Sequence, residues 1–305
     1  MKCLITGGAG FIGSHITDIL IKEGHEVSII DNLSTGDIKN LNKKAVFYKE
    51  DIRNKKAIEK MFEKEKLDYV FHTAAQINVR ESVENPVKDA SINILGTLNL
   101  LEACRKCNVK KFIFSSTGGA IYGDNVKIPT IETEKEQPTS PYGIAKLADE
   151  NYLYFYKKVY GIDYVSLRYS NVYGPRQNYK GEAGVVAIFI NKILNNKQSV
   201  INGSGKQTRD YVYVRDVARA NLLALKLNGI FNVSTGKETS VNELFKMLKK
   251  IMRINVEAVH GPAKKGEQKR SCLDYSKIKG KGWEPKTGLE QGLEATIEWF
   301  KKQKR

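Results

Sequence analysis

Tyr142 and Lys146 are the residues of this sequence whose types and spacing most clearly predict chemistry. They stand four positions apart in the segment YGIAK, directly after Pro141. Residues i and i+4 share one helix face, so we expect the phenol and the ammonium side by side. A free tyrosine has a pKa of about 10, and a nearby lysine together with a positive cofactor ring would lower it. Tyr142 is therefore predicted to remove a proton from a substrate hydroxyl while hydride leaves the same carbon.

Hydroxyl side chains precede this pair at the end of a strand-like run. Residues 114–123 read FSSTGGAIYG. A hydroxyl here could share a proton with Tyr142 and the substrate oxygen. Thr117 is our first choice and Ser116 the second, so the predicted catalytic set is Tyr142, Lys146 and Thr117.

A glycine-rich loop, TGGAGFIG at residues 6–13, follows one strand-like run and opens a helical one. It fits GxGxxG through Gly8, Gly10 and Gly13, and GxxGxxG through Gly7, Gly10 and Gly13. Both spacings allow a tight turn and a close approach of the backbone to a pyrophosphate at a helix N-terminus, where N–H groups and the helix dipole favour anions. The loop predicts a dinucleotide site.

Asp31 ends the next strand-like run, within IIDN at residues 29–32. A carboxylate at this place can accept hydrogen bonds from both ribose hydroxyls and would repel a 2′-phosphate. Since no arginine follows directly, NAD is predicted rather than NADP. Residues 51–52 end the third run, where adenine would lie, and the small side chains at 73–75 end the fourth and leave room for the cofactor.

Short apolar runs alternate with longer amphipathic segments in the first half of the chain. This alternation predicts an α/β fold, a Rossmann-type doubly wound parallel sheet with helices on both faces. Ligands of such sheets bind beyond the carboxyl ends of the strands, where the motifs above fall. Strands are predicted at Lys2–Thr6, Glu26–Ile30, Val46–Tyr48, Tyr69–His72, Phe112–Ser115 and Asp163–Arg168, and helices near 11–23, 54–64, 86–107 and 142–160.

The alternation becomes irregular after about Arg168, which predicts a second lobe. We expect residues 1–168 to form the NAD-binding domain and 169–305 a smaller α/β substrate lobe, with about 209–233 returning to the first domain. Thr287 and Glu290 have the spacing of a capping box for the last helix. The apolar stripe predicted for that helix is Leu289, Leu293, Ile297 and Phe300.

The 305 residues carry a net charge of +16, with 41% hydrophobic and 28% charged residues. The lysines are mixed with glutamates, as in 59–66, which indicates solvated helix faces rather than a nucleic-acid site; such a surface also attracts anionic substrates. Because no apolar run approaches the roughly 20 residues of a membrane helix, and the N-terminus does not resemble a signal peptide, we expect a cytoplasmic protein.

Cys104 and Cys107 form a C-x-x-C pair at the end of a predicted helix. A second such pair or a nearby histidine would be needed to complete a zinc site. The four histidines are scattered along the chain, so no metal site is predicted.

Taken together, these segments resemble the extended short-chain dehydrogenase/reductase family, and within it the UDP-glucose 4-epimerases, over nearly the whole chain. The matching blocks are Thr6–Gly13, Asp31–Gly36, Ser115–Gly123, Tyr142–Lys146, Leu167–Arg176, Arg209–Val214 and Gly282–Pro285. The resemblance implies a tightly bound NAD that takes hydride from C4 of a UDP-sugar and returns it to the other face of a 4-keto intermediate. It also implies a homodimer formed by the helices near 86–107 and 142–160.

The resemblance also assigns site residues by position. The implied cofactor contacts are Gly7, Gly10, Phe11, Ile12, Gly13, Asp31, Asn32, Ser34, Thr35, Gly36, Asp51, Ile52, Thr73, Ala74, Ala75, Gln76, Asn93, Ser115, Tyr142, Lys146 and Tyr169. The implied substrate contacts are Thr117, Tyr142, Asn171, Val186, Arg209, Lys264, Glu267 and Ser271. Among these, Asn171 and Arg209 match the residues that grip the diphosphate.

The chain departs from the family pattern at three places. Gly118 and Gly119 follow the catalytic hydroxyl, and KKGE at 264–267 replaces an Arg-x-Gly-Asp motif that binds phosphate and uridine ribose. Ser271 stands where the family gates the sugar pocket. A small residue there predicts room for an N-acetyl group, so UDP-N-acetylhexosamines are expected substrates besides UDP-hexoses.

Other functions of the same fold stay open at this point. A 4,6-dehydratase or decarboxylase needs an acid beside the catalytic hydroxyl, where this chain has Gly118 and Gly119. A UDP-glucuronate 4-epimerase is a further alternative. A non-catalytic nucleotide-sensing or RNA-binding relative is favoured only by the net charge, and the Tyr142–Lys146 pair argues against it.

Overall fold

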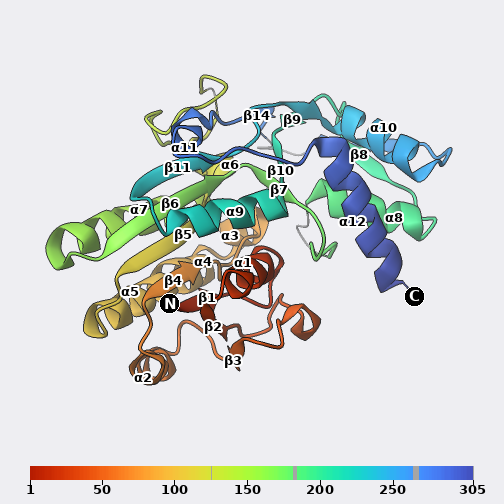
Figure 1. Cartoon of the computed structure of the whole chain (residues 1–305). Coiled ribbons are helices and arrows are strands. Elements are labelled where there is room, and N and C mark those ends of the chain that lie inside the picture. Colours follow the sequence, from red (N-terminus) through yellow and green to blue (C-terminus); the bar gives the residue numbers. More distant parts are fainter. Residues whose placement is uncertain (125, 181–183, 264–267, 305) are drawn as a thin grey trace.

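The computed structural model describes residues 1–124, 126–180, 184–263 and 268–304. Its centre is a seven-stranded sheet in the order β11-β6-β5-β4-β1-β2-β3, in which every neighbouring pair runs parallel (Figure 1). The strand order reverses between β1 and β4, and this is where ligands of open α/β sheets bind. The strands are β1 (Lys2–Thr6), β2 (Glu26–Ile30), β3 (Val46–Tyr48), β4 (Tyr69–His72), β5 (Lys111–Thr117), β6 (Asp163–Tyr169) and β11 (Gly229–Val233).

Helices cover both faces of this sheet because its strands are apolar on both sides. In β1, Cys3 and Ile5 belong to one core and Leu4 to the other, as expected from the alternation of side chains along a strand. The first core includes side chains of α1 (Phe11–Lys22) and α9 (Val214–Ala224). The second includes side chains of α2 (Lys55–Glu65), α5 (Gly96–Lys106) and α7 (Pro141–Tyr160). The predicted doubly wound α/β fold is confirmed.

The helix predicted near 86–107 is not a regular α-helix. It consists of α4 (Pro86–Ala90), a π-helical turn η2 (Ser91–Leu95) and α5. The wider turn carries Asn93, which is buried. Turns of this type are rare overall, but they occur often at functional sites. Their hydrogen-bond pattern does not change the spacing of the apolar residues, so it could not be predicted from that spacing.

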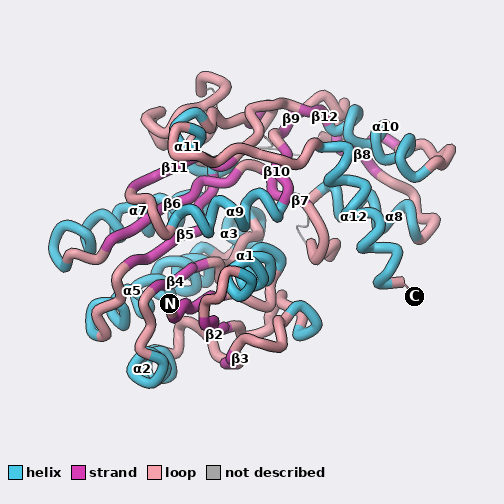
Figure 2. Tube along the Cα trace, in the orientation of Figure 1, coloured by secondary structure: helices cyan, strands magenta, loops and turns pink. Residues whose placement is uncertain are grey.

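The second lobe packs three helices, α8 (Val185–Leu194), α10 (Val241–Met252) and α12 (Leu289–Gln303), around a third apolar core (Figures 1 and 2). Between its two parts the chain returns to the large sheet, where β11 pairs with β6 and α9 packs against α1. Short strands frame the lobe: β7 (Asn171–Tyr173) with β10 (Tyr211–Tyr213), β8 (Val200–Asn202) with β13 (Val259–Gly261), and β9 (Thr208–Arg209) with β12 (Thr239–Ser240) and β14 (Arg270–Ser271).

The capping box predicted for the last helix is wrong. Gly288 is the N-cap residue of α12 and has no side chain to cap it. The backbone N–H of Thr287 instead donates to the Asp216 carboxylate at 3.0 Å, and this buried aspartate comes from α9. This carboxylate holds the segment that leads into α12 and does not cap the helix itself. Leu293, Ile297 and Phe300 are buried along the predicted stripe, and Leu289 is half-buried.

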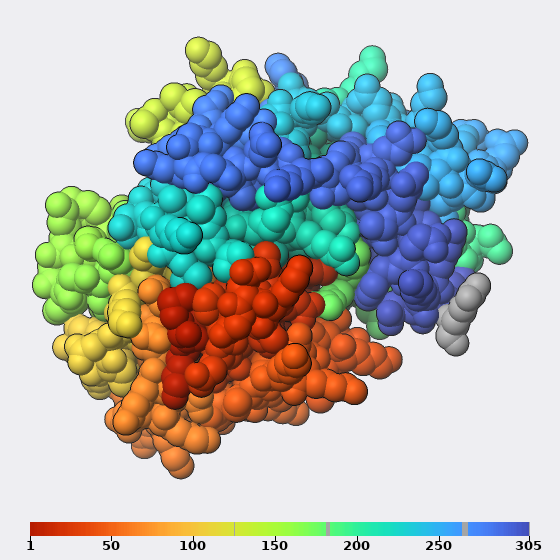
Figure 3. All heavy atoms as spheres, in the orientation of Figure 1, coloured from red at the N-terminus to blue at the C-terminus, as the bar shows by residue number. Residues whose placement is uncertain are grey.

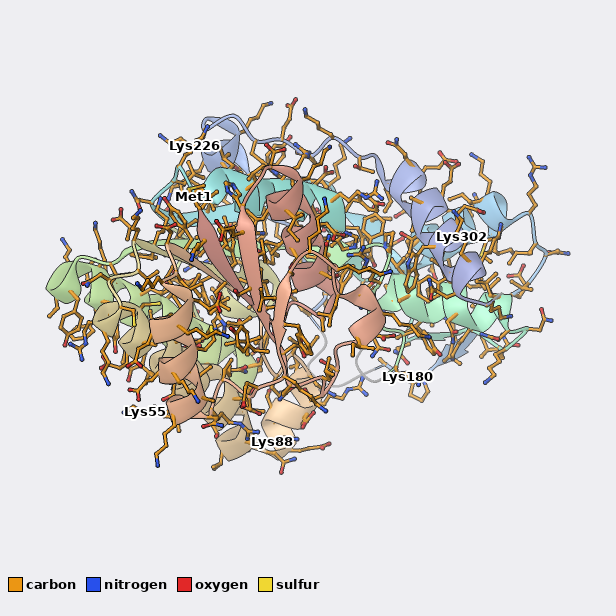
Figure 4. The ribbon with its side chains drawn as sticks, turned by 60° about the horizontal axis from the view of Figure 1, so that its bottom comes forward. Met1, Lys55, Lys88, Lys180, Lys226 and Lys302 are labelled. Carbon is orange, nitrogen blue, oxygen red and sulfur yellow. The ribbon has the colours of Figure 1, made fainter. Side chains whose placement is uncertain are left out.

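The remaining short helices are η1 (Ile38–Asn40), α3 (Val79–Glu84), α6 (Gly118–Ile121) and α11 (Ser276–Lys279). Within the described residues, no helix combines the length and the apolar character needed to cross a membrane. The N-terminal residues and the C-terminal helix occupy opposite parts of the face shown in Figure 3. The labelled lysines, from Lys55 to Lys302, are spread over different parts of the molecule (Figure 4).

Candidate active site

The glycine-rich loop connects β1 to α1 with the geometry that a pyrophosphate needs. Gly7 has a φ of +70°, and Gly10 donates a hydrogen bond to the Gly7 carbonyl at 3.0 Å. A Cβ atom on Gly13 would lie 2.3 Å from the Gly7 oxygen. The N-cap of α1 is Gly10, so the N–H groups of the first turn, which begins with Phe11 and Ile12, can bind an anion.

Asp31 lies beside this loop at the end of β2. Its carboxylate accepts hydrogen bonds from the backbone N–H groups of Ala9 at 3.0 Å and Leu33 at 2.8 Å. Burial raises the pKa of Asp31, and these two hydrogen bonds oppose the rise. A Cβ atom on Gly36 would lie 3.0 Å from the same carboxylate, so the loop carrying Ser34 and Thr35 folds closely over it. This donor and acceptor arrangement fits the ribose of NAD.

Asn32 and Asp51 form the part of the cofactor site next to Asp31, where the adenine of NAD is predicted to lie. The Asn32 amide donates to the Asp51 carboxylate at 2.9 Å. Arg53 forms an ion pair with the same carboxylate at 2.8 Å, and its hydrogen bonds hold the pKa of Asp51 well below the usual range. Asp51 is therefore ionised and held in place, and Ile52 beside it is buried.

The segment after β4 forms the other side of the cofactor site. Thr73 donates to the Thr6 carbonyl at 2.6 Å, and a Cβ atom on Gly7 would lie 2.8 Å from the Ala74 nitrogen. The buried Asn93 side chain binds both backbone groups of Gln76: its oxygen accepts from the N–H at 2.8 Å, and its amide donates to the carbonyl at 3.0 Å. Asn93 thus holds the segment that continues from Ala75.

The catalytic pair lies at the start of α7, which begins one residue earlier than predicted, at Pro141. The Ser140 hydroxyl caps this helix by accepting from the Gly143 N–H at 3.2 Å. Thr117, the last residue of β5, hydrogen-bonds to the Tyr142 phenol. The Ser116 hydroxyl is buried and has no partner among the described residues. The geometry therefore favours Thr117 over Ser116 as the partner of Tyr142.

The pKa of Tyr142 is raised in this structure by the protein alone, whereas the sequence predicted that Lys146 and a positive cofactor ring together would lower it. Burial is the main cause, the charge of Asp89 adds to it, and the hydrogen bond with Thr117 works in the opposite direction. Lys146 is buried, with its Nζ 4.5 Å from the centre of the Phe114 ring. Burial lowers the pKa of Lys146, while the carboxylates of Asp149, Asp89 and Glu150 raise it. Desolvation is thus the largest cause of the shift in both groups.

Tyr169 forms the wall of the site next to Thr117, its register partner in the sheet. Its hydroxyl lies 3.1 Å from the Ser115 hydroxyl and accepts a hydrogen bond from Asn221 at 2.8 Å. Burial raises the pKa of Tyr169 to about 12, so the side chain is a neutral phenol. The sequence reasoning missed Asn221, and nothing in the sequence of α9 marks it, because its partner comes from a strand more than 40 residues away.

The second lobe contains a cavity of about 490 Å³. Its lining includes Asn171, which follows Tyr169 by two residues in the sequence. This volume suits a small-molecule ligand. Three predicted substrate contacts line it, Asn171, Val186 and Arg209. The buried Ser271 pairs with Arg209 in register but is not among the lining residues. Lys264 and Glu267 lie outside the described residues.

Comparison with known proteins identifies the family. The NAD dependent epimerase/dehydratase family matches residues 3–234. The chain belongs to this family. As an NAD-dependent epimerase/dehydratase it is an enzyme with NAD as cofactor, and the glycine loop and Asp31 fit that cofactor.

Solved structures of other epimerases are similar over the whole chain of this NAD-dependent epimerase/dehydratase. UDP-glucose 4-epimerase from Thermotoga maritima with UDP-glucose is 53% identical, with a TM-score of 0.98 and 100% of both chains covered. UDP-glucose 4-epimerase from Thermus thermophilus in complex with NAD is 44% identical, with a TM-score of 0.95 and 99% of both chains covered. UDP-N-acetylglucosamine 4-epimerase from Methanobrevibacter ruminantium is 40% identical, with a TM-score of 0.94 and coverage of 99% of this chain and 98% of that one.

The described part of the chain holds no cluster of three or more histidine, cysteine or acidic side chains that could bind a metal. Cys104 and Cys107 are free thiols at the end of α5, and burial raises the pKa of both.

Proposed function

We propose that this enzyme interconverts UDP-glucose and UDP-galactose, as a UDP-glucose 4-epimerase. The observation that carries the proposal is the pairing of Thr117, at the end of β5, with the Tyr142 phenol at the start of α7, together with a cavity in the second lobe lined by Asn171 and Arg209. The similarity to UDP-glucose 4-epimerases at 53% and 44% identity supports this choice of substrate.

Gly7, Gly10 and Gly13 would hold the pyrophosphate of NAD, and Asp31 the adenosine ribose. When bound, NAD supplies a hydride acceptor and a positive charge near the Tyr142 phenol. That charge is needed because burial alone raises the pKa of Tyr142. Lys146, on the same helix face, adds a second positive charge.

Tyr142 and Thr117 move one proton at the sugar O4 atom. Tyr142 accepts the O4 proton by way of Thr117, and the C4 hydrogen would leave as hydride to the acceptor that bound NAD supplies, which leaves a 4-keto sugar. The proton then returns to the same oxygen, while the hydrogen returns to the opposite face of C4. Since no net proton is consumed, a buried site closed to solvent suits the reaction.

Asn171 and Arg209 anchor the diphosphate while the hexose turns over. The guanidinium of an arginine meets phosphate oxygens with two parallel hydrogen bonds, and this limits movement of the nucleotide. The cavity of about 490 Å³ accommodates the nucleotide in the second lobe. The sugar is then free to rotate next to Thr117 and Tyr142.

One observation separates this function from a 4,6-dehydratase. A 4,6-dehydratase needs an acid beside the catalytic hydroxyl, and the two residues that follow Thr117 are Gly118 and Gly119, which carry no carboxyl group. UDP-N-acetylhexosamines form a second substrate class. The small Ser271 beside Arg209 and the similarity to a UDP-N-acetylglucosamine 4-epimerase support it.

A homodimer is proposed through α4, η2 and α7, which pack against one another. Ile144, Phe155 and Val159 lie on one face of α7, at i, i+11 and i+15, and Val87 and Leu95 come from the neighbouring helix. These five side chains are between 44% and 83% exposed. A second copy of the chain would bury this apolar surface, and the helices of the two copies would pack side by side.

The cytoplasm is the proposed location and galactose metabolism the proposed pathway. All four cysteines are free and three of them are buried, which suits a reducing compartment. The proposed reaction links UDP-galactose to UDP-glucose and so supplies or consumes galactosyl units.

The proposal is tested by NMR of purified protein incubated with UDP-glucose and no added cofactor. We expect UDP-galactose to form, and UDP-N-acetylgalactosamine to form from UDP-N-acetylglucosamine. Tyr142→Phe, which keeps the ring and removes the base, should lose about 10²- to 10⁴-fold in turnover while retaining NAD. A 6-deoxy-4-keto product would identify a dehydratase instead. Turnover of UDP-glucuronate alone, or failure to bind any UDP-sugar with NAD added, would refute the proposal.

A further inference from the structure

A chain of buried hydrogen bonds runs behind the catalytic helix. The Thr6 hydroxyl lies 2.7 Å from Nδ1 of His72, and Nε2 of His72 lies 2.9 Å from the Thr97 hydroxyl. Thr97 lies 3.3 Å from an oxygen of Asp149, which follows Lys146 by three residues on α7. Thr6, His72, Thr97 and Asp149 are all buried. The chain therefore connects the strand that carries the glycine loop with the helix that carries the catalytic pair.

The neighbours of Thr6 determine the hydrogen positions at its end of the chain. Its hydroxyl oxygen accepts from the backbone N–H groups of Thr73 and Ala74, both at 3.2 Å. Its single hydrogen is then donated to Nδ1 of His72. Burial and the charge of Lys146 hold the pKa of His72 well below its usual value, so the ring is neutral. The remaining ring hydrogen is on Nε2, which donates to Thr97.

The Thr97 hydroxyl has a single hydrogen, which it donates to a backbone carbonyl. Its hydroxyl lies 2.5 Å from the backbone oxygen of Asn93, which can only accept. The hydroxyl oxygen already accepts from His72, so towards Asp149 it has a lone pair and no hydrogen. A hydrogen bond between Thr97 and Asp149 then requires the carboxyl group to be the donor.

The surroundings of Asp149 also favour its acid form. Its side chain is 0% exposed, and Oδ1 has no hydrogen-bond partner among the described residues. The charged groups that act on it are Lys146 and Glu150 on α7 and Asp89 on α4; the first stabilises its charge and the other two oppose it. His72, from β4, is neutral. Burial raises the pKa of Asp149 to about 8.

Glu150, the next residue on α7, has different hydrogen-bond partners from Asp149. Arg168, fully buried, donates to both oxygens of Glu150, at 3.1 Å and 2.5 Å, and Ser166 donates to one of them at 2.7 Å. Two adjacent buried acids of one helix therefore have different partners, a guanidinium for Glu150 and a threonine hydroxyl for Asp149.

We propose that Asp149 is a neutral carboxylic acid in the working enzyme and a positioning residue that acts through Lys146: because it carries no charge, it does not offset the Lys146 ammonium, whose charge then acts on Tyr142. The catalytic part of this proposal rests on the proposed epimerase function; the protonation state does not. When Asp149 ionises at alkaline pH, its charge compensates Lys146 and opposes the Tyr142 phenolate. Asp149 thus limits activity on the alkaline side.

Asp149→Asn tests this role, because an amide is neutral at all pH values and can still donate to Thr97. We expect kcat near pH 7 within about twofold of the wild type and the alkaline limb of the pH profile moved up by about one unit or more. Asp163→Asn is the matched control: Asp163 lies just beyond the end of α7 in a partly exposed ion pair with Lys157. It should leave the profile unchanged. A tenfold loss of kcat in Asp149→Asn, or an unmoved alkaline limb, would overturn the catalytic role.

Infrared difference spectroscopy of the NAD-loaded enzyme tests the protonation state without substrate. Wild type minus Asp149→Asn should show a carboxylic acid C=O band near pH 7 that disappears on raising the pH, and wild type minus Asp163→Asn should not. Carbon-13-labelled aspartate in the wild-type enzyme should show one carboxyl signal titrating in the same alkaline range, which keeps the test valid if the variant does not fold. Absence of both signals would refute the acid form. Their presence in an enzyme that does not turn over UDP-glucose would retain the acid form and reject the epimerase function.

Discussion

Replacing Gly13 by alanine should abolish cofactor binding while leaving the fold in place. The added Cβ would lie 2.3 Å from the Gly7 oxygen and 2.7 Å from the Thr73 hydroxyl oxygen. The first contact is with backbone, so the glycine loop has to move by roughly 1 Å to reach an ordinary carbon–oxygen separation. Gly13 has helical backbone within α1, where alanine is otherwise favoured by about 1 kcal/mol.

The magnitude follows from these contacts. Overpacking of this kind costs about 1–3 kcal/mol, which the helix propensity of alanine offsets in part. A shift of the loop also weakens its hydrogen bonds to the pyrophosphate, each worth about 1.5–3 kcal/mol when the acceptor is charged. Loss of two such bonds corresponds to a decrease in NAD affinity of at least 100-fold.

The assay is the amount of NAD released per chain from denatured, purified protein, together with the melting temperature. Gly24→Ala is the matched control: Gly24 follows the same helix, has a φ of +80° and has open space around it. The control should lose about 1–2 kcal/mol of stability through backbone strain and retain its NAD. Full NAD occupancy in Gly13→Ala, or equal loss in both variants, would refute the reasoning.

Two further predictions concern the dimer and the response to acid. Phe155→Asp should produce a monomer in sedimentation experiments by placing a charge in the proposed interface. Ile38→Asp should not, because Ile38, which is 60% exposed against 44% for Phe155, lies outside the proposed interface; a dimeric Phe155→Asp would contradict the proposal. Burial lowers the pKa of His15 to about 4 from about 6.5 in the unfolded chain. Its contribution to stability is therefore complete above about pH 6.5 and is lost as the pH falls towards 4. Urea unfolding of the NAD-loaded enzyme near pH 5 and pH 7.5 should show a loss of roughly 2 kcal/mol that His15→Gln lacks, since glutamine can still donate to the Pro175 carbonyl; equal losses in both proteins would exclude this role.

The local features of the site were predictable because each depends on neighbours in the sequence. The glycine loop needs only a strand, three glycines and a helix, and all lie within residues 2–22. The Tyr142–Lys146 pair needs only the periodicity of one helix. The parallel sheet follows from alternating strands and helices, because parallel strands require a crossover between them.

The features that failed depend on residues far apart in the chain. Asp216 binds the backbone N–H of Thr287, before α12, from 71 positions away, and Asn221 reaches Tyr169 from α9. The helix predicted at 86–107 contains a π-helical turn, whose Asn93 side chain holds Gln76. A hydrogen bond between distant residues produces no periodic pattern in the sequence from which it could be predicted.

The sequence by itself determined which groups are present and which of them share a helix face or a strand end. Only the tertiary structure decided their charge states. Lys146 stands one turn from Tyr142 in any helix, yet the pKa of Tyr142 rises, because the fold buries the phenol near Asp89. Asp149 and Glu150 are adjacent acids, but Arg168 reaches only one of them. Desolvation and hydrogen-bond partners depend on every element packed around a group, and this is why protonation is a property of the fold.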